Sequence, residues 1–62
     1  MEEKERLREQ SIYRCDQLLM DLKRNKEDAQ AFLGGEIYRA YAKATEEAIQ
    51  KTRKVRTKIR NL

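Results

Sequence analysis

The last twelve residues of this chain carry the side chains with the clearest binding chemistry. Residues 51–62 read KTRKVRTKIRNL, with no acid and six cations: Lys51, Arg53, Lys54, Arg56, Lys58 and Arg60. The first fifty residues hold nine cations and eleven acids, so the last twelve supply the whole net charge of +4. A run of one sign is often only a solvated helix face, but clustered lysines and arginines also bind phosphates or acidic protein surfaces. We therefore take these six cations as candidate partner-binding or nucleic-acid-binding residues.

Tyr13 joins this candidate set because tyrosine is enriched at the energetic centres of protein interfaces. It falls beside the apolar position Ile12, so both partner contact and packing at the edge of a helix interface are open to it. Residues 51–62, which we call the basic segment, have no aromatic residue on which a nucleic-acid base could stack. Its apolar sector is also narrow, which disfavours an anionic membrane surface as the partner.

The residue types needed for catalysis or metal binding are scarce. The chain has no histidine and a single cysteine, Cys15, so a cysteine–histidine pair cannot form. It has no cluster of soft ligands for a structural zinc ion. At 62 residues, it is also too short to enclose a ligand pocket of about 300 Å³ or more. We expect neither an enzyme nor a bound metal or cofactor.

Length and composition predict a single all-α domain over residues 1–62. The chain is 42% charged, contains no proline and is rich in good helix formers, and it shows no alternating strand pattern. A chain of this size buries only about 60% of its unfolded surface. Because neither a disulfide nor a metal is available to stabilise it, association is the remaining route. We expect a homodimer, most simply with two-fold symmetry.

Two apolar seams follow the three- and four-residue steps that place side chains on one helix face. The first contains Ile12, Cys15, Leu19, Leu22 and Ala29, and Lys26 interrupts it. The second is thinner and runs through Tyr38, Tyr41, Thr45, Ala48, Thr52, Val55, Ile59 and Leu62. As core or dimer contacts we predict Ile12, Cys15, Leu19, Leu22, Tyr41, Ala48, Val55 and Ile59, with Cys15 as a small buried hydrophobe.

Two points along the chain could reverse its direction. Residues 23–28 place cations, then Asn25, then acids, which is the order of one helix end and the capped start of another. Gly34 and Gly35 together cost about 2 kcal/mol inside a helix. We favour an antiparallel hairpin that turns at the glycines, where residue i faces roughly residue 69 − i. A turn near Asn25, or a short middle helix between the two points, stays open as an alternative. Two such hairpins would pack as a four-helix bundle or coiled-coil-like dimer.

No segment of the sequence is typical of a membrane span or a secretion signal. The longest apolar run is Leu18-Leu19-Met20, whereas a span needs about 20 apolar residues. The N-terminus is too charged for a signal peptide, and one unpaired cysteine suits a reducing compartment. We expect a cytoplasmic protein that does not enter a membrane.

These features predict a small dimeric α-helical regulator or adaptor that binds a larger protein. A DNA-binding transcription regulator would suit the basic segment, which could dock on an acidic surface or on nearby nucleic acid. The alternative is a direct, largely sequence-independent binder of RNA or DNA. The layout is similar to that of the Rop family of plasmid copy-number proteins, in which two helical hairpins pair and grip RNA loops. The likeness lies in length and helix count, so it implies no functional residue of this chain.

Overall fold

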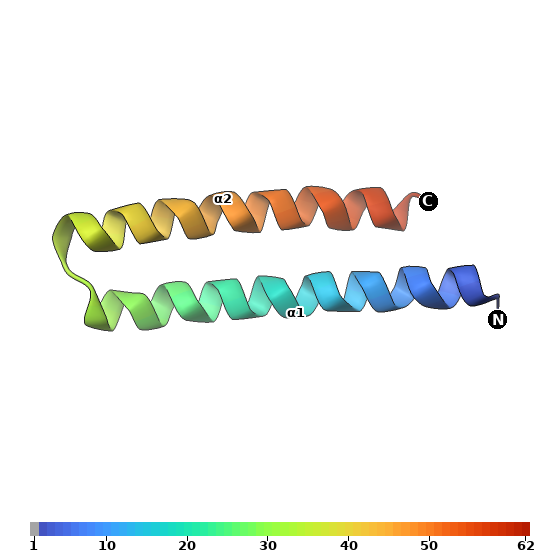
Figure 1. The fold of residues 1–62 in the computed structure, drawn as a ribbon, viewed down its shortest axis with the longest axis horizontal. Helices are drawn as coiled ribbons and strands as arrows, with labels where there is room; N and C mark the ends of the chain where they lie inside the picture. Colours follow the sequence, from blue (N-terminus) through green and yellow to red (C-terminus); the bar gives the residue numbers. More distant parts are fainter. Residues whose placement is uncertain (1) are drawn as a thin grey trace.

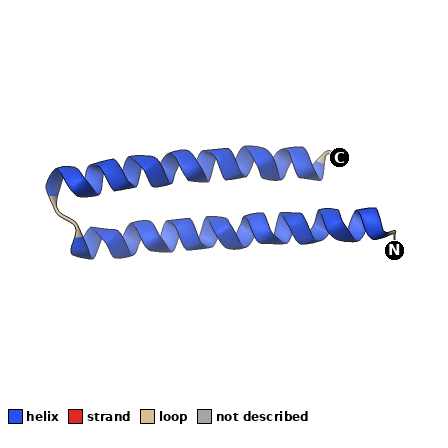
Figure 2. Ribbon diagram, viewed as in Figure 1, coloured by secondary structure: helices blue, strands red, loops and turns tan. Residues whose placement is uncertain are grey.

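The computed structural model describes residues 2–62 and shows two antiparallel α-helices joined by one tight turn (Figures 1 and 2). Helix α1 spans Glu3–Phe32 and helix α2 spans Gly35–Arg60. The Cα atoms extend over 49 × 16 × 9 Å, so the molecule is one helix thick. The predicted all-α hairpin is confirmed.

The chain reverses at the two glycines, as the favoured interpretation predicted. The backbone N–H of Leu33 donates to the carbonyl of Ala29 at 2.8 Å and closes the last turn of α1. Gly34 is extended, and Gly35 has a φ of +53°, which side-chain-bearing residues rarely adopt. Gly35 is therefore the residue whose lack of a side chain the turn requires.

The alternative turning point lies within continuous helix. Residues 23–28 are all α-helical, so neither a turn near Asn25 nor a separate middle helix is present. Asparagine costs well under about 1 kcal/mol in a helix interior, less than the pair of glycines. Lys26, which interrupts the first apolar seam, is half-buried and donates from Nζ to Oε1 of Glu46 at 2.7 Å. The ion pair explains why a charged side chain is tolerated at this position.

The two helices meet along a narrow inter-helix face. Among residues 2–62, only Ala29, Thr45 and Ile49 are buried. Half-buried residues continue the face along α1 through Arg8, Ile12, Cys15, Leu19 and Leu22 to Leu33 just past its end, and along α2 through Tyr38, Ala42, Ala48, Thr52, Arg56 and Ile59. The hydroxyl of Thr45 donates to the Tyr41 carbonyl at 2.9 Å, so it needs no partner on α1. Small side chains and satisfied hydroxyls allow the helices to pack closely.

Two ion pairs report the register of the hairpin. Lys26 pairs with Glu46, and Arg56 Nε donates to Oδ1 of Asp16 at 2.6 Å; in both pairs the residue numbers add to 72. The turn position alone predicted a sum near 69. A helical side chain covers the surface about one position N-terminal to its own Cα, and this shift acts in both helices. Two residues whose side chains meet should therefore have numbers that add to about two more than those of two residues whose backbones lie opposite each other.

Substitution of the turn glycines should show that only Gly35 needs to lack a side chain, whereas Gly34 acts as an extended helix cap. Gly35→Ala places a side chain in the left-handed region and should lower the free energy of unfolding by about 1–2 kcal/mol. Gly34→Ser should be neutral or stabilising, because Gly34 precedes α2 in an extended conformation where serine is a favoured cap. Urea unfolding followed by circular dichroism, at one protein concentration, measures both. Equal losses in the two variants would contradict this account of the turn.

Candidate interaction surfaces

An exposed apolar stripe lies along one side of the hairpin. Its members each precede a residue of the inter-helix face by one position, and they are Leu7, Leu18 and Phe32 on α1 and Ile37, Tyr41, Ala44 and Val55 on α2. One position is a rotation of about 100° about the helix axis. Because the helices are antiparallel and both right-handed, an equal rotation moves both sets to the same side of the pair. The two rows therefore form one surface, which we call the apolar stripe.

The large side chains of the apolar stripe are well exposed. The exposed fraction is 48% for Leu18, 86% for Phe32 and 67% for Ile37. Leu62, just beyond the end of α2, extends the stripe and is 81% exposed. The stripe is not wholly apolar, because polar and charged residues occupy the positions between its apolar members: Ser11, Arg14, Asp21, Asn25 and Asp28 on α1, and Glu47, Lys51 and Lys58 on α2. Its apolar members nevertheless run from the N-terminal turns of α1 to the loop.

The predicted seam residues divide between the inter-helix face and this stripe. Ile12, Cys15, Leu19 and Leu22 of the first seam face α2, and Ile59 of α2 faces α1. Tyr41 and Val55 are exposed at 39% and 49% and belong to the apolar stripe. Ala48 is half-buried at the border between the two. The seam of α2 therefore combines two neighbouring rows of side chains, and Arg56 takes the position facing α1 next to Val55.

The six cations of residues 51–62 fall into two rows of different chemistry. The arginines Arg53, Arg56 and Arg60 recur at steps of three and four, and so do the lysines Lys51, Lys54 and Lys58. Arg53 and Arg60 each follow an inter-helix residue, so they lie on the side opposite the apolar stripe, and Arg56 lies on the inter-helix face between them. Of the lysines, Lys54 points away from α1, whereas Lys51 and Lys58 each precede an inter-helix residue and lie on the side of the apolar stripe. Arginine offers a rigid planar fork for carboxylates and phosphates, whereas lysine is a compact, strongly hydrated charge.

Tyr13 and Met20 lie on the same side as the arginine row. Each follows an inter-helix residue of α1 by one position, and their exposed fractions are 63% and 56%. Tyrosine, methionine and arginine are the residue types enriched at protein interfaces. We call the set of Tyr13, Met20, Arg53, Arg56 and Arg60 the partner patch. Sequence reasoning missed Met20, whose signal is its seven-residue spacing from Tyr13.

Asp16 holds the central arginine of the partner patch. Its two carboxylate oxygens accept hydrogen bonds from Arg56 Nε at 2.6 Å and from Arg56 Nη2 at 3.5 Å. Within residues 2–62, none of the other five cations of the basic segment makes an ion pair. Arg53 and Arg60 are therefore available to a partner while Arg56 is held in place. Asp16 was not among the predicted site residues, because its role depends on the register of the two helices.

The antiparallel pairing concentrates positive charge in the middle of the rod. Residues 10–24 of α1 lie beside residues 48–62, and together these segments hold nine cations and two acids, a net charge of +7. The N-terminal residues 1–9 sum to −1 and the loop end, residues 25–47, sums to −2. We call the central region the basic belt. Arg14, Lys23 and Arg24 join the six predicted cations there.

The ion pair between Lys26 and Glu46 borders the basic belt on its loop side. The hydrogen bond to Lys26, reinforced by its charge, lowers the pKa of Glu46 below its ordinary 4.5. The same hydrogen bond raises the pKa of Lys26 above 10.5, against a smaller opposing effect of desolvation. Both shifts favour the charged forms. The pair therefore helps to hold the register of the helices at neutral pH.

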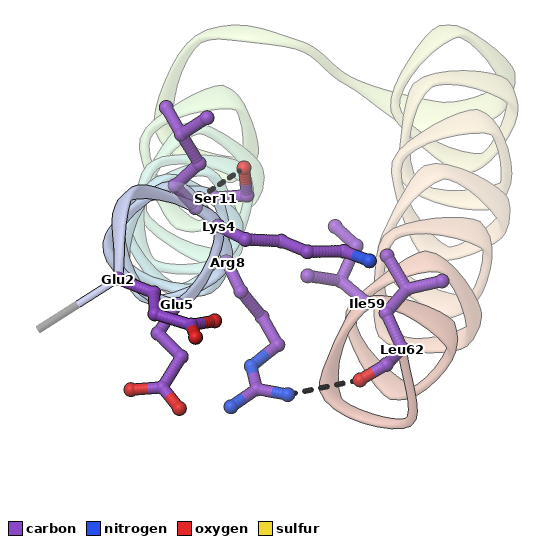
Figure 3. Close-up of a pocket in the computed structure, with 8 residues that line it drawn as sticks. Glu2, Lys4, Glu5, Arg8, Ser11, Ile59 and Leu62 are labelled. Atoms are coloured by element: carbon purple, nitrogen blue, oxygen red, sulfur yellow. Dashed lines mark hydrogen bonds between the residues drawn. The ribbon is translucent and has the colours of Figure 1, made fainter.

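The open end of the hairpin contains a hollow of about 410 Å³. Its apolar lining comes from Leu7, Ile59 and Leu62, and Ser11 and Lys4 border it. Figure 3 shows the side chain of Lys4 extending from α1 toward α2, and Arg8 donating to the carbonyl of Leu62 at 2.9 Å. Figure 1 shows α1 continuing past the end of α2 here, and most residues that line the hollow belong to the first turns of α1.

Neither helix of the described chain is long and apolar enough to cross a membrane. Comparisons with models of protein families, with curated proteins and with solved structures found no match to this chain.

Removing the Glu46 carboxylate should destabilise the hairpin in a pH-dependent way. The lowered pKa of Glu46 means that its contribution is present above pH 4.5 and is lost as the pH falls through the lowered value. The raised pKa of Lys26 means that the contribution persists at least to pH 10.5. The melting temperature of Glu46→Gln should therefore lie below that of the wild type at neutral pH, and the gap should close in acid.

Glu47→Gln is the matched control, since it removes the same charge from the next residue, which makes no ion pair within the described chain. Thermal melts followed by circular dichroism at several pH values compare the three proteins. A gap of equal size for both variants, or one that persists in strong acid, would show that the Lys26–Glu46 pair is not its source.

Proposed function

We propose that this chain is a dimeric α-helical regulator or adaptor that binds an acidic surface of a larger protein through the partner patch. The observation that carries the proposal is the arginine row beside Tyr13 and Met20. Arg53 and Arg60 are exposed and unpaired within residues 2–62, and Asp16 orients Arg56 between them. Arginine forks bind carboxylates bidentately, and an adjacent tyrosine adds rigid contact area at low entropic cost.

The composition of the partner patch favours a protein over a bare phosphate backbone. Phosphate binding requires only clustered positive charge, which the lysine row would supply as well as the arginine row. The separation of the two residue types, with the arginines beside Tyr13 and Met20, is instead typical of a protein interface. A DNA-binding transcription regulator is the partner class that also suits the lysine row, because DNA held by that partner would attract it.

Charge-matched double variants test which row binds. Arg53→Gln with Arg60→Gln removes two charges from the partner patch, and Lys54→Gln with Lys58→Gln removes two from the lysine row. We expect the arginine variant to lose stoichiometric protein capture from the native lysate after nuclease treatment, with affinity falling about tenfold or more. The lysine variant should retain most of it. Affinity capture with mass spectrometry, followed by titration of the identified partner, measures the difference.

Direct nucleic-acid binding is the second candidate, and the +7 charge of the basic belt supports it. Titration with DNA and RNA duplexes and hairpins at two salt concentrations distinguishes the two functions. A direct binder would show a steep salt dependence and similar losses in the arginine and lysine variants, because phosphate contacts depend mainly on charge. That result, together with protein capture that disappears after nuclease treatment, would replace the adaptor function with this one.

A further inference from the structure

The surface area of the hairpin indicates that part of it is covered by another molecule. The chain exposes 5306 Å², whereas a compact monomer of its mass, 7.4 kDa, exposes about 4,200 Å². The excess is about 1,100 Å², and a standard protein interface removes about 800 Å² from each partner. One interface of ordinary size along the rod would therefore bring the exposed area to that of a compact protein.

The apolar stripe is the side that such an interface would cover. It carries most of the strongly exposed large apolar side chains, including Phe32, Ile37 and Leu62. Ile37, Tyr41 and Ala44 of α2 follow the three- and four-residue steps of helix-bundle packing. Leu7, Leu18 and Phe32 of α1 share one helix face at the wider spacings of 11 and 14 residues. A single hairpin presents two adjacent helices with this pattern, and a second identical hairpin presents the same pattern in return. Self-pairing of one surface is what two-fold symmetry requires.

The shape of the hairpin distinguishes the two possible orientations. The bulky side chains Phe32, Ile37 and Tyr41 gather at the loop end, and the hollow lined by Leu7, Ile59 and Leu62 lies at the open end. If both loops lay at one end of the dimer, the bulky side chains of one copy would face those of the other, and the two hollows would face each other. With the loops at opposite ends, the bulk of each copy faces the hollow of the other, which suits the close packing of protein interiors.

The spacing of the stripe residues fits the opposed orientation. Leu18 lies near the midpoint between Leu7 and Phe32 along α1. A two-fold axis near Leu18 therefore brings Leu7 of one copy over Phe32 of the other. The same axis brings the two basic belts side by side, with Arg14, Lys51 and Lys58 on the side of the interface. Arg53 and Arg60 stay on the outer sides because they lie opposite the stripe.

We propose that a second copy of this chain packs its apolar stripe against the first, with the loops at opposite ends of a four-helix bundle. The inference deepens the dimer named in the proposed function and rests on it. Its consequence is a bundle with two partner patches, one on each outer side, so that one dimer can hold two acidic surfaces.

The first test is the mass of the protein in solution. Sedimentation equilibrium at micromolar concentration should give twice the chain mass of 7.4 kDa for the wild type. Leu18→Glu should weaken dimerisation by about a hundredfold or more, because it places a charge at the centre of the buried stripe. Met20→Glu, on the opposite side of the same helix and 56% exposed, should remain a dimer. A folded wild-type monomer, or equal losses in the two variants, would overturn the proposal.

The second test measures the orientation directly. In a Cys15→Ser background, which is first checked to remain a dimer, Glu36→Cys accepts a spin label at the loop end. Opposed loops should separate the two labels by about 40 Å, the length of a helix of this size, whereas loops at one end would hold them within about 20 Å. The short distance would overturn the orientation.

These tests are independent of the partner patch. Arg53→Gln with Arg60→Gln should leave both the solution mass and the label distance unchanged, since the arginine row lies away from the stripe. A wild-type monomer that still binds an acidic protein through these arginines would overturn the pairing inferred here and leave the docking role of the patch in place. A dimer with opposed loops that binds no protein would support the pairing inferred here and overturn the docking role of the partner patch.

Discussion

Two helices can bury only one narrow face of each other, and this constraint governs the rest of the molecule. Small residues such as Ala29 and Thr45 fill that face, and three side chains of the described residues are buried. Close approach limits how much apolar area the pair removes from water, because small side chains have little area to bury. Two ion pairs, Asp16–Arg56 and Lys26–Glu46, link the helices in addition. The remaining large apolar side chains must therefore stay on the surface, where they form the apolar stripe.

The rotation between neighbouring helix positions separates the surfaces of the hairpin. Residues one position before the inter-helix face form the apolar stripe, and residues one position after it include Tyr13, Met20, Arg53 and Arg60. Most of the large exposed apolar side chains and the exposed arginines Arg53 and Arg60 consequently occupy opposite sides of a molecule only one helix thick. The surface proposed for a second copy and the surface proposed for an acidic partner are therefore separate, so binding at one would leave the other open. The antiparallel pairing also concentrates the charge, because it adds Arg14, Lys23 and Arg24 to the basic segment.

The fold could be predicted from local chemistry, whereas the surfaces depended on the register. Helix-forming composition and the cost of Gly34 and Gly35 were enough to predict a hairpin and its turn. The second seam was less clear in sequence, because Tyr41 and Val55 lie only one position from residues that face α1. Periodicity cannot separate two apolar rows that are about 100° apart on a helix. The role of Asp16 and the charge of the basic belt depend on which residues lie opposite each other, and that information is not local.

The position of Lys26 also bears on slippage between the helices. A heptad pattern with small side chains would tolerate a shift of seven residues, since similar side chains would again oppose each other. In the observed alignment Lys26 meets Glu46. A shift of seven residues in one direction would bring Lys26 opposite Arg53, and a shift in the other direction would bring it opposite Arg39. Both misaligned pairings bring like charges together, so a single lysine penalises each of the two nearest errors in alignment that apolar packing alone would allow.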